Sequence, residues 1–131
     1  MFLDASAVIA ILASEDDAAS LTARLDRAHE VHTSAVAIYE AVVGLARIGN
    51  VPADDASALV DGLLDETNAT IVPIDGATGR EAVAAFFRYG KGRHPAALNM
   101  GDCFAYACTR QLATALLCKG NDFPRTDIDL A

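Results

Sequence analysis

The sequence predicts an α/β domain in which helices cover both faces of a mostly parallel sheet, because short strand patterns alternate with helical patterns along the chain. Its 131 residues suit one domain spanning residues 1–131. Hydrophobic residues make up 53% of the chain, which is enough for a substantial core and too many for a disordered segment. We therefore expect a three-layer α/β/α arrangement whose sheet has four or five short strands.

The first elements are a buried strand at Phe2–Leu3 and a helix over Ser6–Ala13. The segment Glu15–His29 has helical spacing, because its apolar residues recur on one side and its charges lie elsewhere. Val31–Thr33 is expected to form the second strand.

Two helices follow, over Ser34–Ile48 and Pro52–Glu66. The first begins with a serine, a favoured N-cap, and ends at a Gly-Asn pair of the kind that terminates helices. The second begins with a proline, which is favoured in the first helical turn. Ala69–Ile74 is the expected third strand.

The C-terminal part predicts a helix over Gly76–Tyr89, a basic loop at Gly90–Leu98 and a helix over Asp102–Leu112. Ala113–Leu117 is the expected fourth strand, and a short piece around Ile128 is a candidate fifth.

The net charge of −8 argues against a protein that coats nucleic acid through a broad basic face. It does not exclude a nuclease, which can concentrate negative charge around metal ions, and it favours a partner with a basic segment. No apolar stretch approaches the roughly 20 residues of a membrane helix, and the apolar start is interrupted by Asp4. The three cysteines show no metal-ligand spacing, so we expect a cytoplasmic protein with reduced thiols and no membrane contact.

Three acids lie in apolar surroundings that normally exclude a charge. Asp4 is the only charged residue among the first 14, and Glu40 and Asp102 each stand alone in a long uncharged segment. A buried carboxylate needs a cation, hydrogen bonds or a proton, and a shared divalent metal would satisfy all three acids together. Asp122 follows the fourth strand as Asp4 follows the first, so both should reach the carboxyl edge of the sheet, where ligands bind in such folds.

Simpler roles remain open for each acid. Asp4 and Asp102 each precede a helix and could be N-caps, and Asp122 could be an ordinary loop acid. Glu40 has no capping role but could pair with Arg47 on the same helix.

With these residues assembled, nearly the whole chain resembles a PIN domain of the VapC toxin group. The matching segments are FLDASA, TSAVAIYEA, GKGRHPAALNMGDCFAYA and LLCKGNDFPRTDI. The resemblance implies that Asp4, Glu40, Asp102 and Asp122 are catalytic acids that bind Mg2+ or Mn2+, and that Ser6 is the hydroxyl of the site. At Asn121 some relatives have a further acid. The resemblance also implies RNA cleavage and inhibition by a cognate antitoxin.

Two other functions remain open. A phosphatase or phosphotransferase could use Asp4 as a nucleophile, with Lys119 as the available lysine, and a non-enzymatic acidic interaction domain would use its acids as caps. The basic loop offers Arg88, Lys91 and Arg93 as candidates for RNA binding. A homodimer is also expected, because the helix that contains Glu40 is apolar on more than one face.

Overall fold

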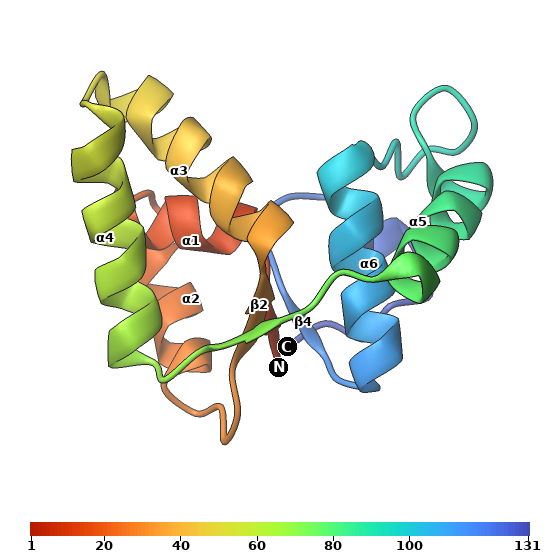
Figure 1. Ribbon diagram of the computed structural model, residues 1–131, viewed down its shortest axis with the longest axis horizontal. Coiled ribbons are helices and arrows are strands. Elements are labelled where there is room, and N and C mark those ends of the chain that lie inside the picture. Colours follow the sequence, from red (N-terminus) through yellow and green to blue (C-terminus); the bar gives the residue numbers. More distant parts are fainter.

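Four short parallel strands form the centre of the computed structural model, which describes residues 1–131 (Figure 1). They are β1 (Phe2–Leu3), β2 (His32–Ser34), β3 (Thr70–Val72) and β4 (Leu116–Leu117). Their order across the sheet is β3-β2-β1-β4, and every pairing is parallel. The expected fifth strand near Ile128 is a single parallel bridge between Leu116 and Leu130.

Helices cover both faces of this sheet and complete the predicted three layers. In Figure 1, the first four helices lie on one side of the strands and α5 and α6 lie on the other. The helices are α1 (Ala5–Leu12), α2 (Ala18–Leu25), α3 (Ala35–Gly49), α4 (Ala53–Glu66), α5 (Gly76–Tyr89) and α6 (Met100–Leu112), followed by the short 3-10 helix η1 (Phe123–Arg125).

The central strands divide the core into two parts. Successive residues of a strand point to opposite faces of a sheet. Phe2 and Leu116 therefore pack with α5 and α6, whereas Leu3 and Leu117 pack with the helices on the other face. All four side chains are fully buried. Each of the two-residue strands β1 and β4 thus contributes one side chain to each core. Because both side chains of β1 are held in this way, the position of Asp4 directly after the strand is also fixed.

Five of the six helix starts differ from the sequence-based expectation by one to three residues, and those of α1 (Ala5) and α3 (Ala35) differ by one. α2 begins at Ala18 and not at Glu15, because Ser14 adopts a left-handed conformation and a turn follows α1. Pro52 is the N-cap of α4 and so lies just before the helix. α6 begins at Met100 with Asn99 as its N-cap, so Asp102 lies inside the first turn.

The start of α3 is stabilised by its N-cap. The hydroxyl of buried Ser34 accepts a hydrogen bond from the Ala37 N–H at 3.2 Å. At the other end, Asn50 adopts a left-handed conformation with φ of 48° and its N–H donates to the Ala46 carbonyl. Both ends of the predicted helix therefore have the capping residues that the sequence indicates.

We predict that Ser34→Ala lowers the stability of the fold, because one N–H at the start of α3 loses its acceptor in a buried place. The expected loss is about 0.5–2 kcal/mol, measured by urea unfolding. Ser20→Ala is the matched control, since Ser20 is exposed within α2 and makes no side-chain hydrogen bond. Equal stability of the two variants would show that the Ser34 cap contributes nothing.

Candidate functional site

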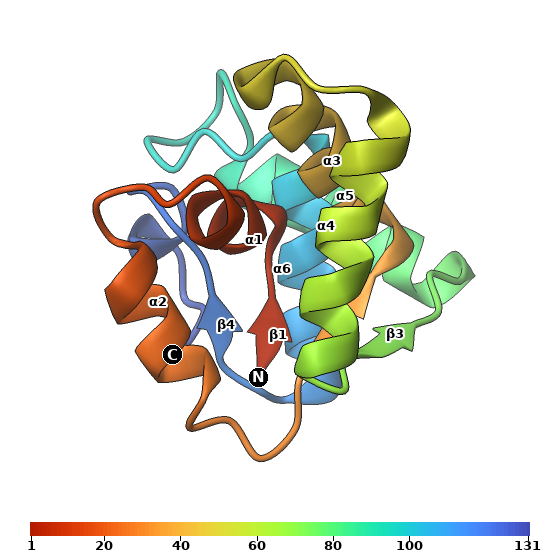
Figure 2. The ribbon, with the colours of Figure 1, turned by 90° about the vertical axis from the view of Figure 1, so that its left-hand side faces the viewer.

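Asp4, Glu40 and Asp102 line one pocket of about 380 Å³ at the carboxyl edge of the sheet. Asp4 directly follows β1, Glu40 lies within α3, and Asp102 lies in the first turn of α6. Figure 2 shows β1 and β4 both pointing toward α1, which begins at this edge. The structure thus brings together three acids that are far apart in the sequence.

Asp4 combines a capping role with a place in the pocket. Its side chain is the N-cap of α1, accepting a hydrogen bond from the Ser6 N–H at 3.0 Å, and it is only 3% exposed. Burial raises the pKa of this carboxyl above its usual value, and the hydrogen bonds from Ser6 oppose that rise. Both Ser6 bonds use Oδ2, so Oδ1 is free to bind another group.

Ser6 joins Asp4 to the loop that follows β4. Its hydroxyl donates to Asp4 Oδ2 and accepts a hydrogen bond from the Lys119 N–H at 2.9 Å. The Lys119 ammonium is in turn paired with Glu15 and, at 3.0 Å, with Asp17. The expected site hydroxyl therefore holds the carboxylate in place and connects it to the segment that carries Asp122.

Glu40 is the least satisfied of the three acids. No hydrogen bond or ion pair reaches its carboxylate, and the alternative pair with Arg47 does not form. Partial burial, and then repulsion from Asp4 and Asp102, raise its pKa to about 7. A side-chain carbon at Gly101 would overlap the Glu40 carboxyl group, so the glycine makes room for this acid at the start of α6.

Asp102 is the third residue of α6 and not its N-cap. Its Oδ2 accepts a hydrogen bond from the Asn99 N–H at 2.8 Å, and its own N–H donates to the Asn99 side chain at 3.0 Å. Burial raises its pKa to about 6, although the bond from Asn99 opposes the rise and the charges of Asp4 and Asp122 add to it. Its other carboxylate oxygen accepts no hydrogen bond.

Asp122 lies beside the pocket and does not line it. It is exposed at the start of η1, where its side chain caps nothing. Its charge nevertheless acts on Asp102 and on the Cys118 thiol, which places it near the other acids. Asn121 is also exposed.

The three lining acids provide oxygen donors of the kind that Mg2+ and Mn2+ prefer. No three carboxylate, thiol or imidazole groups are close enough to form a closed set of ligands. Mg2+ usually binds one or two carboxylates and keeps several waters, so an open arrangement fits this ion. The raised pKa values also fit a place that favours a cation, because a positive charge would relieve the repulsion among the acids.

The predicted RNA-binding loop does not line the acid pocket. Arg88 pairs with Asp127 at 3.0 Å, and the Arg93 guanidinium stacks over the rings of Phe86 and Phe87. All three candidates are exposed, and Lys91 is the one that makes no such contact. In Figure 1 the loop lies beside the N-terminal end of α6.

Sequence reasoning missed part of the pocket wall. Tyr39, Val43 and Asn99 line it, and so does Arg47, which the sequence offers only as a possible ion-pair partner of Glu40. The four-residue spacing from Tyr39 to Val43 to Arg47 on a predicted helix was the available signal, because such residues share one side of a helix.

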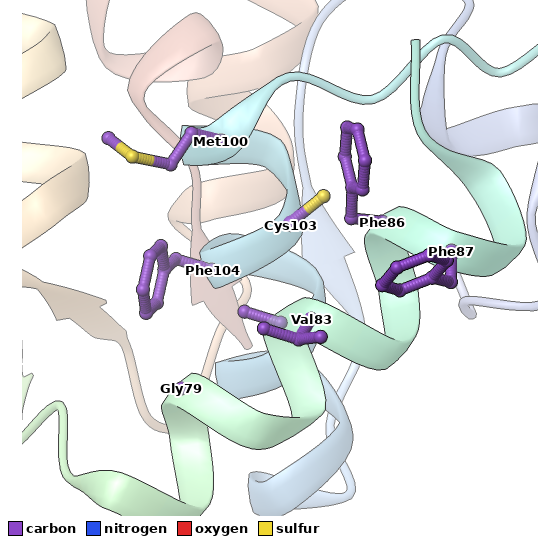
Figure 3. A pocket seen from close by; sticks show the side chains of 8 residues that line it. Gly79, Val83, Phe86, Phe87, Met100, Cys103 and Phe104 are labelled. Carbon is purple, nitrogen blue, oxygen red and sulfur yellow. The ribbon is translucent and has the colours of Figure 1, made fainter. Parts of the chain in front are cut away.

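A second hollow lies between α5 and α6 and is almost entirely apolar (Figure 3). Figure 3 shows Phe86, Phe87 and Val83 of α5 on one side and Met100 and Phe104 of α6 on the other. It contains no acid, so it offers a contact surface and no catalytic chemistry.

The two rival functions receive little support from this arrangement. Lys119, which a phosphatase would need beside Asp4, has its ammonium held by Glu15 and Asp17 and does not line the pocket. Asp4 and Asp102 do act at helix starts, but capping does not explain the unpaired Glu40 between them. None of the helices has the length and apolar character needed to cross a bilayer.

Comparisons with known proteins agree with the geometry. The family model of the PIN domain matches residues 1–129. A VapC ribonuclease of Rhizobium meliloti is 40% identical, over 97% of this chain and 98% of that protein. The ribonuclease VapC36 of Mycobacterium tuberculosis is 39% identical, over 98% of this chain and 91% of its own length.

The fold also has a counterpart among solved structures. The crystal structure of Mycobacterium tuberculosis VapC20, described as a Sarcin-Ricin loop cleaving toxin, superposes with a TM-score of 0.77. The alignment covers 99% of this chain and 97% of that one, at 14% identity, and so supports the fold alone. From the family match and the two close relatives, the chain belongs to the PIN domain family and, within it, to the VapC ribonucleases.

Proposed function

We propose that this protein is a metal-dependent endoribonuclease, the toxin of a toxin–antitoxin pair, which acts in the cytoplasm on RNA phosphodiester bonds. The observation that carries the proposal is the pocket in which Asp4, Glu40 and Asp102 meet with raised pKa values. The names of the relatives support the ribonuclease activity.

The acids of the chain would hold Mg2+ or Mn2+ through the carboxylate oxygens that lack hydrogen bonds. Asp4 and Asp102 are oriented by Ser6 and Asn99, so each presents its second oxygen from a fixed position. With a pKa of about 7, Glu40 would be partly protonated near neutral pH while no cation is bound, and a bound cation would favour its deprotonated form. Asp122 would contribute from the edge of the pocket.

When bound, the ion would offset charge that develops on the phosphate and lower the pKa of the attacking water. The chain itself positions the carboxylates, supplies Glu40 as a group that can exchange a proton near neutral pH, and shields Asp4 from solvent.

We expect Asp4→Asn and Asp102→Asn to abolish most RNA cleavage while the protein still folds. Changes to groups that only orient a ligand cost about 10- to 100-fold, so loss of a direct ligand should cost about 100-fold or more. Cleavage of a fluorescent single-stranded RNA in Mg2+ measures this, with circular dichroism as the check on folding. If the double variant Asp4→Asn/Asp102→Asn folds and still cleaves RNA fully in excess chelator, the metal-nuclease function is wrong.

Gly101→Ala tests the position of Glu40 without changing any acid. The added methyl group would overlap the Glu40 carboxyl group, so that carboxyl group must move and cleavage should fall with the fold intact. Gly62→Ala is the matched control, since it is also helical and its new methyl group would contact nothing within 4 Å. Equal activity of the two variants would show that the place of Glu40 is unimportant.

In the presence of a chelator, which keeps the site free of metal, the free energy of unfolding should fall as the pH rises. The pKa of Glu40 goes from 4.5 to about 7 on folding and that of Asp102 from 3.8 to about 6. The folded state therefore binds more protons than the unfolded state between about pH 4 and pH 7, and rising pH favours unfolding there. Thermal melts across this range should show a decline that Glu40→Gln reduces.

Mg2+ should reverse this decline. Protons and the cation compete for the same carboxylates, so Mg2+ should raise the melting temperature more at pH 7.5 than at pH 5. An equal shift at both pH values, or the same shift in Asp4→Asn/Asp102→Asn, would place the bound ion elsewhere.

The proposed partners are the RNA substrate, a cognate antitoxin and a second copy of the chain. An acidic pocket attracts an arginine or lysine, so an antitoxin peptide lying along it would block the acids. For the homodimer, the apolar hollow of α5 and α6 supplies exposed surface at Val83, Phe87 and Met100. These side chains are 56%, 62% and 69% exposed, so a second copy packed against them would bury apolar surface.

We predict that Phe87→Glu weakens the dimer, because it places a charge in that apolar surface. Light scattering over a range of concentrations would measure the change, with Ile71→Glu as a control at an exposed apolar residue of β3, outside this hollow. A wild-type chain that stays monomeric at every concentration would contradict the dimer.

A further inference from the structure

One row of side chains on α3 borders the acid pocket and has no role in the chemistry described above. Tyr39, Val43 and Arg47 are four residues apart, so they follow one another along the same side of the helix. All three line the pocket that contains Glu40. Tyr39 is 65% exposed and Val43 is 47% exposed, and Arg47 is also exposed.

Arg47 is the cation on the wall of this pocket, and its guanidinium makes no ion pair and no hydrogen bond within the chain. The arginines of the predicted RNA-binding loop are occupied, Arg88 by Asp127 and Arg93 by aromatic rings. A polyanion that approaches the acids therefore meets Arg47 as the free positive charge on the pocket wall.

We propose that α3 is a single-strand RNA contact in which Tyr39 stacks on an unpaired nucleobase next to the cleaved phosphate and Arg47 binds a phosphate of the same strand. The proposal rests on the ribonuclease function and adds its substrate contact. An exposed aromatic face binds bases of any identity, and a guanidinium matches two phosphate oxygens. Tyr39 lines the same pocket as Glu40, so the stacked base would lie beside the acids.

The surroundings of Tyr39 favour RNA over a protein partner. Its companions on the pocket wall include Glu40, Asn99 and Arg47, which are polar, whereas the apolar hollow that suits a protein surface lies between α5 and α6. A base paired within a duplex is already stacked and cannot lie on Tyr39. The arrangement thus predicts a preference for unpaired strands.

The test measures binding of a fluorescent single-stranded RNA in Mg2+, in an Asp102→Asn background that prevents cleavage. Tyr39→Ala should weaken binding by about 5- to 150-fold, the range for loss of one stacked base. Tyr39→Phe should bind as the parent does, because it keeps the ring. Val43→Ala is the matched control for loss of apolar surface from the same row, and should change affinity by less than about 2-fold.

The contribution of Arg47 is tested by the salt dependence of RNA binding. Arg47→Gln should lower the salt dependence of binding, reducing the slope of log K against log salt by about 0.7 for one phosphate of a single strand. Tyr39→Ala should leave that slope unchanged, since stacking releases no counterions. A duplex of the same sequence should bind equally to the parent and to Tyr39→Ala.

Single-turnover cleavage by the otherwise unaltered protein separates this proposal from the proposed function. If the unaltered protein fails to cleave RNA, the ribonuclease function itself is wrong. If it cleaves, and Tyr39→Ala binds RNA like its parent or no worse than Val43→Ala, only the stacking contact is wrong. A Tyr39→Ala variant that binds RNA normally but becomes monomeric in light scattering would assign the row to a protein interface.

Discussion

The main constraint on this structure is that three carboxyl groups line one partly buried pocket. Burial disfavours the charged form and raises the pKa of Asp4, Glu40 and Asp102, and repulsion from neighbouring acids adds to the rise for Glu40 and Asp102. The folded chain tolerates this arrangement because two of the acids receive hydrogen bonds that fix one oxygen each. The other oxygen of Asp4 and of Asp102, and the carboxylate of Glu40, accept no hydrogen bond and pair with no cation of the chain. These oxygens are the ones that a bound cation would contact.

Structural and functional roles coincide in these acids. Asp4 caps α1, and Asp102 takes part in a capping box with Asn99, so each carboxylate stabilises a helix start while facing the pocket. Capping alone would therefore be a correct but incomplete account of both residues. Glu40 distinguishes the two explanations, because it lies inside α3, caps nothing and places its carboxyl group where a side-chain carbon at residue 101 would be.

Much of the fold was predictable because its signals are local. Alternating patterns identified the strands and the long helices, and the caps at Ser34 and Asn50 marked both ends of α3. The pocket was predictable for Asp4, Glu40 and Asp102 because isolated acids in apolar segments need a common explanation. The ion pair of Arg88 was not predictable, because it joins the basic loop to Asp127, a segment that only the folded chain brings near.

The two-residue length of β1 has a consequence for how this chain can vary. Phe2 and Leu3 point into opposite cores, and Asp4 follows at once as the cap of α1. Inserting or deleting one residue between Phe2 and Asp4 would exchange the two core faces and rotate the acid away from its partners. We therefore expect this segment to tolerate substitutions that keep both side chains apolar, and not to tolerate a change in its length.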